Sequence, residues 1–183
     1  MVALIIVIAI VLLIIVYGVS TYNSFIKLRN QAESASASID VHLKERYDLV
    51  PNLVECVKGY AKHESSTLEA VISARNRAVS ATNVEEKNEA NKLLSSSLKS
   101  LFALAEAYPD LKANASFLQL QQKLGDIESG LLNARKYYNA IVRDFNTKRE
   151  TFPSSIIASM SHFKALSYAE VEDEAKARVE VKF

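Results

Sequence analysis

The sequence is poor in residues that break helices. Its 183 residues include four glycines and three prolines. Together with many Ala, Leu, Lys and Glu residues, this scarcity argues against a turn-rich sheet protein and favours long helices. There is one cysteine, Cys56, which excludes an intrachain disulfide and a metal cluster held by several thiolates.

The chain also lacks a surplus of charge of either sign. The formal net charge is +1. A protein that binds nucleic acid needs a basic surplus on one face, so we expect no nucleic-acid partner.

No charged side chain occurs before Lys27. Residues 2–19 form an apolar run of 18 residues, which as a helix would span about 27 Å and just cross a bilayer core. Tyr17 and Tyr22 stand where interfacial aromatic anchors belong, followed by Lys27. We predict an uncleaved transmembrane helix over residues 1–21, with the lipid bilayer as a partner.

Two other interpretations of this segment fit less well. A cleaved signal peptide would have a basic n-region and a clear Ala-x-Ala site, and neither is present. A type IV pilin-like start would carry an early glutamate, which is also absent.

Lys27 and Arg29 follow the span, so the positive-inside rule places the rest of the chain in the cytoplasm.

The remaining sequence shows helical periodicity almost throughout. In the clearest segment, 114–150, apolar residues recur every three or four positions, as on the packed face of a bundle helix. They are Phe117, Leu120, Leu124, Ile127, Leu131, Ala134, Tyr138, Ile141 and Phe145. Similar seams predict helices over about 22–49, 51–82 and 84–107.

Pro51 separates the first two of these predicted helices. A proline clashes with the carbonyl four residues before it, so we expect a helix end or a kink there. Asp48 could cap the restart. The turn between the second and third helices is expected at Thr82–Asn83, and Asp110 or Asn114 could cap the fourth helix.

The predicted fold class is therefore all-α. A transmembrane helix precedes a long antiparallel four-helix bundle over residues 22–166, which ends in a short helix at 155–165. Residues 167–183 form a charged C-terminal tail, whose last five residues alternate apolar and polar like a strand.

No enzyme or metal motif is present. The three histidines, His42, His63 and His162, are not preceded at three residues by glutamate, as a di-iron bundle would require. HESST at 63–67 is not the H-E-x-x-H of zinc proteases. We expect no catalytic residue, no metal and no cofactor, and the protein to be no enzyme.

Several polar residues lie on or near the predicted seams and in the loops. One interpretation is structural: these residues form interhelical ion pairs and a solvated face. The other interpretation is functional: they form a face that binds a partner. The candidates are Asp40, Arg46, Asp48, Asn52, Glu55, His63, Glu64, Arg75, Glu106, Tyr108, Asp110 and Arg135.

The sequence resembles the LemA family. The resemblance is carried by IDVHLKERYDLVPNLVECVKGYAKHE (39–64), LEAVISARNRA (68–78), AEAYPDLKANASFLQLQQKL (105–124), ESGLLNARKYYNAIVRDFN (128–146) and FPSSIIA (152–158). It departs from the family before Ile39, where a tryptophan is often found, at Tyr47 in place of a frequent histidine, and at residues 168–170.

This resemblance implies a bacterial, single-pass inner-membrane protein with a long helical bundle. It supplies no activity, although some relatives are associated with building magnetosome membranes. The first functional hypothesis is a membrane-anchored scaffold that self-associates into a homo-oligomer and helps to organise or shape a membrane. The alternative is a membrane-tethered adaptor or sensor that binds another protein through residues 39–64 and the 108–114 loop.

Overall fold

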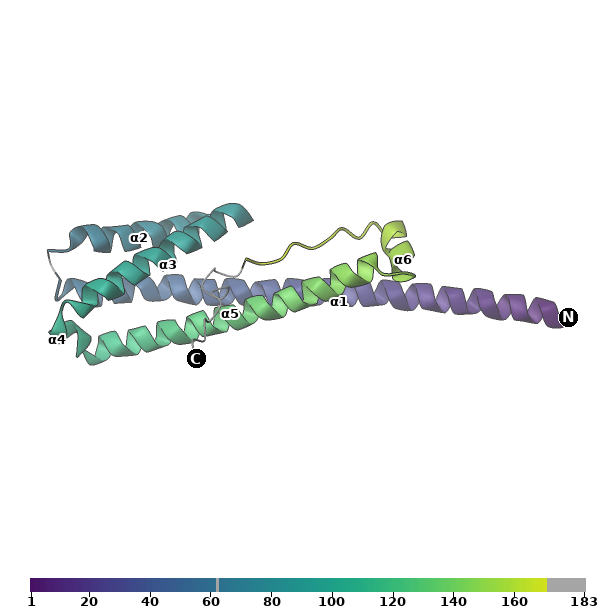
Figure 1. Ribbon diagram of the computed structural model, residues 1–183, viewed down its shortest axis with the longest axis horizontal. Helices are drawn as coiled ribbons and strands as arrows, with labels where there is room; N and C mark the ends of the chain where they lie inside the picture. The colour runs from purple at the N-terminus through teal and green to yellow at the C-terminus, as the bar shows by residue number, and fades with distance from the viewer. Residues whose placement is uncertain (62, 171–183) are drawn as a thin grey trace, which may run out of the picture. The chain divides into compact units, whose positions relative to one another are not determined.

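The computed structural model describes residues 1–61 and 63–170 and shows an all-α fold (Figure 1). This confirms the fold class predicted from the helical periodicity. The helices of the described residues are α1 Val2–Lys58, α2 Ser65–Ser80, α3 Val84–Glu106, α4 Pro109–Lys112, α5 Ala115–Glu150 and α6 Ser154–Met160.

The chain divides into two compact units. Of the described residues, unit 1 comprises 1–38 and 134–169, and unit 2 comprises 39–133 together with Glu170. Helices α1 and α5 each contribute a segment to both units. The predicted tail therefore begins inside the described structure, while residues 171–183, including its strand-like end, lie outside the described residues.

Unit 2 holds the four-helix part of the fold. Residues of α1, α2, α3 and α5 share one apolar core, with Leu53 and Val57 of α1, Val71 of α2 and Leu94 and Leu101 of α3 completely buried. These are seam positions at three- and four-residue spacing, so burying them is what selects the helix faces. Because α2 and α3 are short, this four-helix arrangement is confined to unit 2.

The prediction of a helix over 51–82 was wrong. Helix α1 runs without interruption through Pro51 to Lys58, and the break falls at residues 59–64. Asp48 consequently caps nothing, and lies inside α1. The sequence HE at 63–64 belongs to the loop before α2 rather than to a helix.

A hydrogen bond from another helix explains how α1 tolerates Pro51. Proline has no N–H, so the carbonyl four residues earlier, that of Tyr47, loses its helical donor. In the structure the Tyr47 carbonyl oxygen accepts a hydrogen bond from Arg75 Nε of α2, at 3.2 Å. The guanidinium thus replaces the missing amide, and an orphaned carbonyl in a half-buried place is avoided.

The connections use ordinary capping chemistry. Asn83 caps α3 by accepting a hydrogen bond from the Glu86 amide at 2.8 Å, while Glu86 Oε2 accepts from the Thr82 amide at 3.2 Å. The hydrogen bond from the Thr82 backbone to the Glu86 carboxylate, and after it one from the Asn83 side chain, lowers the pKa of Glu86 from its ordinary value. Asn114 caps α5, its Oδ1 accepting from the Phe117 amide at 3.0 Å.

An aromatic cluster holds unit 1 together. Phe25 of α1, Phe145 of α5 and Phe163, which follows α6, pack with ring centroids 4.9 to 6.1 Å apart. Lys148 Nζ lies 5.6 Å from the centroid of the Phe25 ring and donates to Ser24 Oγ. The cluster ties α6 and the segment after it to the two long helices of this unit.

Helix α6 ends earlier than the predicted 165 because the chain turns at His162. The Phe163 amide donates to the Ala158 carbonyl at 3.0 Å and the His162 amide to the Ser159 carbonyl at 3.2 Å. This pair of bonds is the Schellman arrangement, which needs a left-handed residue at the position of His162. His162 adopts it, with φ of 54°.

The segment after α6 is held in an extended path by two asparagines of α5. Asn146 exchanges side-chain hydrogen bonds with the amide and carbonyl of Leu166, at 3.0 and 2.9 Å. Asn139 does the same with Ala169, at 2.8 and 3.0 Å. Asn139 and Asn146 are seven residues apart on a helix, and Leu166 and Ala169 are three residues apart on an extended segment. Both separations are about 10 Å, so the two asparagine side chains can each reach one residue of the extended segment.

The substitution of Arg75 by Met tests the repair of the helix at Pro51. We expect Arg75→Met to lower the free energy of unfolding by about 1 kcal/mol, the worth of a half-exposed charged hydrogen bond. In a Pro51→Ala background, the backbone amide of residue 51 can donate to the Tyr47 carbonyl. Arg75→Met should then lower the free energy of unfolding by less than half as much. Denaturant unfolding in detergent, followed by circular dichroism, measures both values.

Arg77→Met is the matched control, since Arg77 is exposed two residues further along α2 and pairs only loosely with Glu89, at 3.5 Å. An equal cost of Arg75→Met with and without the proline at position 51 would show that Arg75 does not compensate for it.

Candidate functional site

The most deeply buried charge of the described residues is Arg46. Its side chain is 2% exposed. Arg46 lies in the part of α1 that belongs to unit 2. Nε lies 2.8 Å from Glu128 Oε1 of α5, and Nη2 donates to Ser95 Oγ of α3 at 2.8 Å. One guanidinium therefore joins three helices of the bundle.

The surroundings of Arg46 are not fully complementary. Nε and Nη1 are buried without a hydrogen bond of good geometry to any described residue, although Nε forms the ion pair with Glu128. Burying a cation in this way is costly unless a carboxylate stays beside it. We infer that Arg46 constrains the register of α1 against α3 and α5, because a shift of either partner would leave the charge uncompensated.

A second polar contact adjoins Arg46 along α1. Tyr47 donates its hydroxyl to Asn91 Oδ1 of α3 at 2.9 Å, and Asn91 Nδ2 donates to the Lys87 carbonyl at 2.8 Å. Asn91 is buried. The interior of unit 2 thus carries consecutive polar links from α1 to α3.

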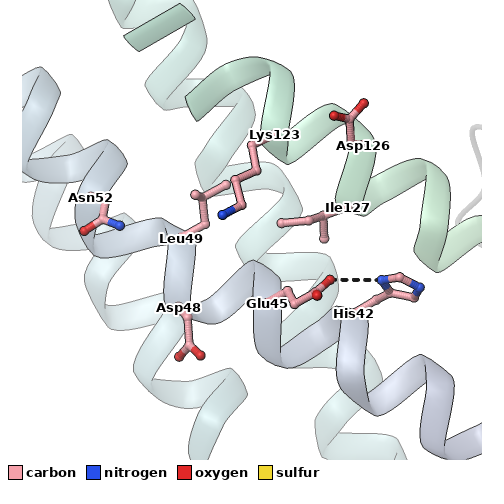
Figure 2. A pocket seen from close by; sticks show the side chains of 8 residues that line it. All are labelled: His42, Glu45, Asp48, Leu49, Asn52, Lys123, Asp126 and Ile127. Atoms are coloured by element: carbon pink, nitrogen blue, oxygen red, sulfur yellow. Dashed lines mark hydrogen bonds and ion pairs between the residues drawn. The ribbon is translucent and has the colours of Figure 1, made fainter. Parts of the chain in front are cut away.

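An open groove lies beside these contacts, on the surface between α1 and α5. Its volume is about 640 Å³. Figure 2 shows Leu49 of α1 and Ile127 of α5 facing each other, with Lys123 extending from α5. The groove is lined by His42, Glu45, Asp48, Leu49, Asn52, Lys123, Asp126 and Ile127.

The groove is shaped by a close approach between His42 and Gly130 of α5. A Cβ atom at Gly130 would lie 2.8 Å from His42 Cε1, which is closer than real contacts allow. Any other residue at this position would require the His42 ring to move. His42 Nδ1 also lies 3.1 Å from Glu45 Oε2, the pair joined by the dashed line in Figure 2.

Asp48 and Asn52 are the two candidate residues that the structure brings into this groove. A second, smaller hollow of about 320 Å³ contains Asp40, Asp48 and Arg75, together with Tyr47 and Lys87. Asp40 forms an ion pair with Lys87 at 3.5 Å, and Asp48 with Lys44 at 2.6 Å. Both aspartates are exposed, so these pairs add little stability.

Another group of candidates lies at the end of unit 2 where α1 meets α2 and α3 meets α5 through α4 (Figure 1). Asn114 Nδ2 donates to the Tyr60 hydroxyl at 2.9 Å and so links the two connections. Cys56 lies there too, its Sγ 3.9 Å from Asn114 Oδ1, and burial raises the pKa of the Cys56 thiol.

The candidates at this end have mixed surroundings. Glu106 pairs with Lys112, and Glu55 pairs with Lys58 at 3.4 Å. Tyr108 is half-buried against the apolar core. The exposed or half-exposed members with no role in the core are His63, Glu64 and Asp110.

The remaining candidates belong to unit 1. Arg135 lies half-buried on α5 and makes polar contacts. Tyr17 is 42% exposed and Tyr22 is 44% exposed, the latter with its ring 5.8 Å from that of Phe163. Lys27 is exposed on α1. Within unit 2, the polar candidates therefore lie in several separate places.

Sequence reasoning missed several residues that matter in the structure. Ser95, Asn91 and Glu128 hold Arg46 and Tyr47, while Lys123 and Asp126 line the groove. Asn91 follows Lys87 by one turn and precedes Ser95 by one turn on the same helix, so a polar stripe beside the α3 seam was the available signal. Among the described residues, no three His, Cys, Asp or Glu side chains are placed to share a metal ion.

The ion pair of Arg46 predicts an asymmetry between its two members. Glu128→Gln leaves a cation buried, so we expect the free energy of unfolding to fall by about 2 kcal/mol, a value reduced because Glu128 is partly exposed. Arg46→Met leaves a carboxylate that water can reach, so we expect a change within about 1 kcal/mol. Denaturant unfolding in detergent measures both.

Asp126→Asn is the control, because Asp126 is an exposed carboxylate on the same helix. A larger loss of stability from the arginine substitution than from the glutamate one would contradict this role of Arg46.

Comparisons with known proteins identify the family of the chain. The LemA family profile matches residues 35–183. Protein LemA of Metamycoplasma hominis is 27% identical over 140 residues, which cover 74% of this chain and 63% of that protein. Magnetosome protein MamQ of Magnetospirillum gryphiswaldense is 22% identical over 173 residues, which cover 80% of this chain and 64% of that protein.

The chain thus spans less than two thirds of the length of both relatives. One helix of the described residues, α1, contains a window long and apolar enough to cross a membrane, and that window is not buried by the rest of the chain. Its apolar start and these relatives indicate a membrane-associated protein. Since the family match covers most of its residues, the chain belongs to the LemA family.

Proposed function

We propose that this protein is a non-enzymatic scaffold, anchored in the bacterial inner membrane by the first part of α1, that self-associates into a homo-oligomer. The observation that carries the proposal is the exposure of every residue from 2 to 17 on a helix that continues directly into the bundle. Lys27 and Arg29 after the span favour a cytoplasmic bundle.

Apolar side chains on the surface of α2 support self-association. Ile72 is 43% exposed and Val79 is 53% exposed, two turns apart on one side of the helix. The net charge of +1 offers little repulsion between copies. The relative named as a magnetosome protein is the reason to propose membrane organisation as the process served.

The mass of the detergent-extracted protein tests self-association. We expect light scattering after size exclusion to give multiples of the 20.3 kDa chain, corrected for detergent, over a range of protein concentrations. Ile72→Glu with Val79→Glu should shift this distribution toward the monomer, because two charges would be buried between copies. A monomer at every concentration contradicts the proposal.

Ser66→Glu with Ser73→Glu is the matched control for that variant. Both serines are exposed on α2 and have the same seven-residue spacing, and the pair adds the same charge on a different side of the helix. An equal loss of oligomer in both variants would mean that charge alone, rather than the Ile72 and Val79 surface, disperses the copies.

The groove between α1 and α5 favours one alternative, a membrane-tethered adaptor that binds another protein. Asp48 and Asn52 are exposed on its α1 side, within the stretch 39–64, and the 108–114 loop is the second candidate contact. In the adaptor interpretation, polar side chains in an open groove select the partner.

A pull-down from membranes separates the alternative from the scaffold. If the protein is an adaptor, Asp48→Ala with Asn52→Ala should remove a captured partner while the mass of the homo-oligomer stays unchanged. Glu89→Ala, a change on α3 away from the groove lining, controls for general loss of charge. An unchanged set of captured proteins argues against the adaptor.

A further inference from the structure

Helix α6 has an apolar face that nothing in the described chain covers. Phe152, Ile156 and Met160 are 77%, 51% and 74% exposed. Their spacing of four residues places them along one side of the helix and the turn before it. Single exposed apolar residues are common, but three in a line on so short an element indicate a contact that the isolated chain does not make.

The opposite face of α6 is fixed to its own unit. Ser154 and Ala158 are 7% and 2% exposed, also four residues apart. Ser154 Oγ donates to the Lys148 carbonyl at 2.7 Å, and Ala158 packs with Phe25 and Phe145. The exposed face is therefore presented in a set orientation.

The position of α6 beside α1 indicates which partner covers the exposed face of Phe152, Ile156 and Met160. A Cβ atom at Gly18 would lie 3.7 Å from Ile157 Cδ1, in ordinary contact. Gly18 stands one residue before the end of the apolar run, and the polar residues Ser20 and Thr21 follow Val19. Helix α6 is thus beside the point where the anchor leaves the bilayer, where interfacial side chains are found.

Two cations lie at the same place. Arg29 and Lys164 line a hollow of about 330 Å³ together with Tyr22, His162 and Phe163. In the part of the chain that the structure describes, the ion pairs do not include Arg29 or Lys164. Cations that pair with no carboxylate of the described residues, and that lie beside an apolar face, suit the phosphates of anionic lipids.

We propose that α6 is an interfacial membrane-binding helix. Phe152, Ile156 and Met160 insert between the lipid headgroups beside the anchor, and the hollow lined by Arg29 and Lys164 takes a headgroup phosphate. This inference rests on the proposed membrane anchoring and gives unit 1 a second attachment to the same bilayer. Two attachments restrict the rotation and tilt of this unit, which a single helix does not.

The absence of tryptophan from the sequence makes a direct test possible. The full chain carrying Phe152→Trp is reconstituted into vesicles of zwitterionic and anionic phospholipids with brominated acyl chains, which quench tryptophan only on contact. We expect most of the fluorescence of this single tryptophan to be lost and its emission to shift to shorter wavelength relative to detergent.

Tyr137→Trp is the matched control. Tyr137 is 59% exposed on the part of α5 that belongs to the same unit, and the tryptophan introduced there should stay bright in the same vesicles. If the Phe152→Trp chain is as bright as the Tyr137→Trp chain, the interfacial role of α6 is overturned.

The lipid composition tests the role of the cations. In the Phe152→Trp chain, Arg29→Gln with Lys164→Gln should reduce the quenching in anionic vesicles to the level found in purely zwitterionic ones. Equal quenching in all three cases overturns the headgroup contact.

Failure of this inference is distinguishable from failure of the proposed function. Resistance of the same vesicles to alkaline extraction reports the anchor, and the mass of the extracted protein reports self-association. Helical circular dichroism of each variant in detergent shows that it has folded. A Phe152→Trp chain that resists extraction and self-associates while its tryptophan remains bright contradicts the role of α6 alone.

Discussion

The apolar start of α1 is the constraint on which the rest of the structure depends. None of residues 2–17 is covered by the described chain, and an uncovered apolar surface of this size is unfavourable in water. A bilayer removes that surface from water, and the helix needs no water there because it bonds its own amides and carbonyls. Helix α1 contributes a segment to each of the two units.

Side chains of neighbouring helices complete the hydrogen bonds and the ion pair of α1. At Pro51 it takes a hydrogen-bond donor from Arg75, and at Arg46 it takes a carboxylate and a hydroxyl from α5 and α3. Each contact is costly to break because a carbonyl or a cation would be left without a partner. Polar contacts of this kind add little net stability, but they disfavour other registers of the same apolar seams.

Much of the fold follows from periodicity, and the exceptions have identifiable causes. The seams from Leu94 and Phe117 place α3 and α5, and the apolar run places the start of α1. Pro51 misled the prediction because the compensating donor, Arg75, lies in a different helix and cannot be inferred from local sequence. The early end of α6 at Met160 was hidden because a histidine, not a glycine, adopts the left-handed turn.

The candidate site was predicted less completely than the fold. Arg46 was recognised as polar and near a seam, but its partners come from residues 95 and 128. Only the packing of three helices brings these groups together, and no local pattern in the sequence contains that information.

The central claim is that the protein is a self-associating scaffold anchored by the first part of α1. A structure of the full-length chain in a lipid bilayer, determined by electron cryo-microscopy, tests this claim most directly. We predict particles with more than one copy, residues 2–19 within the acyl region, and α1 continuous from there through Pro51. Single copies in the bilayer, or an apolar segment lying outside it, would contradict that claim.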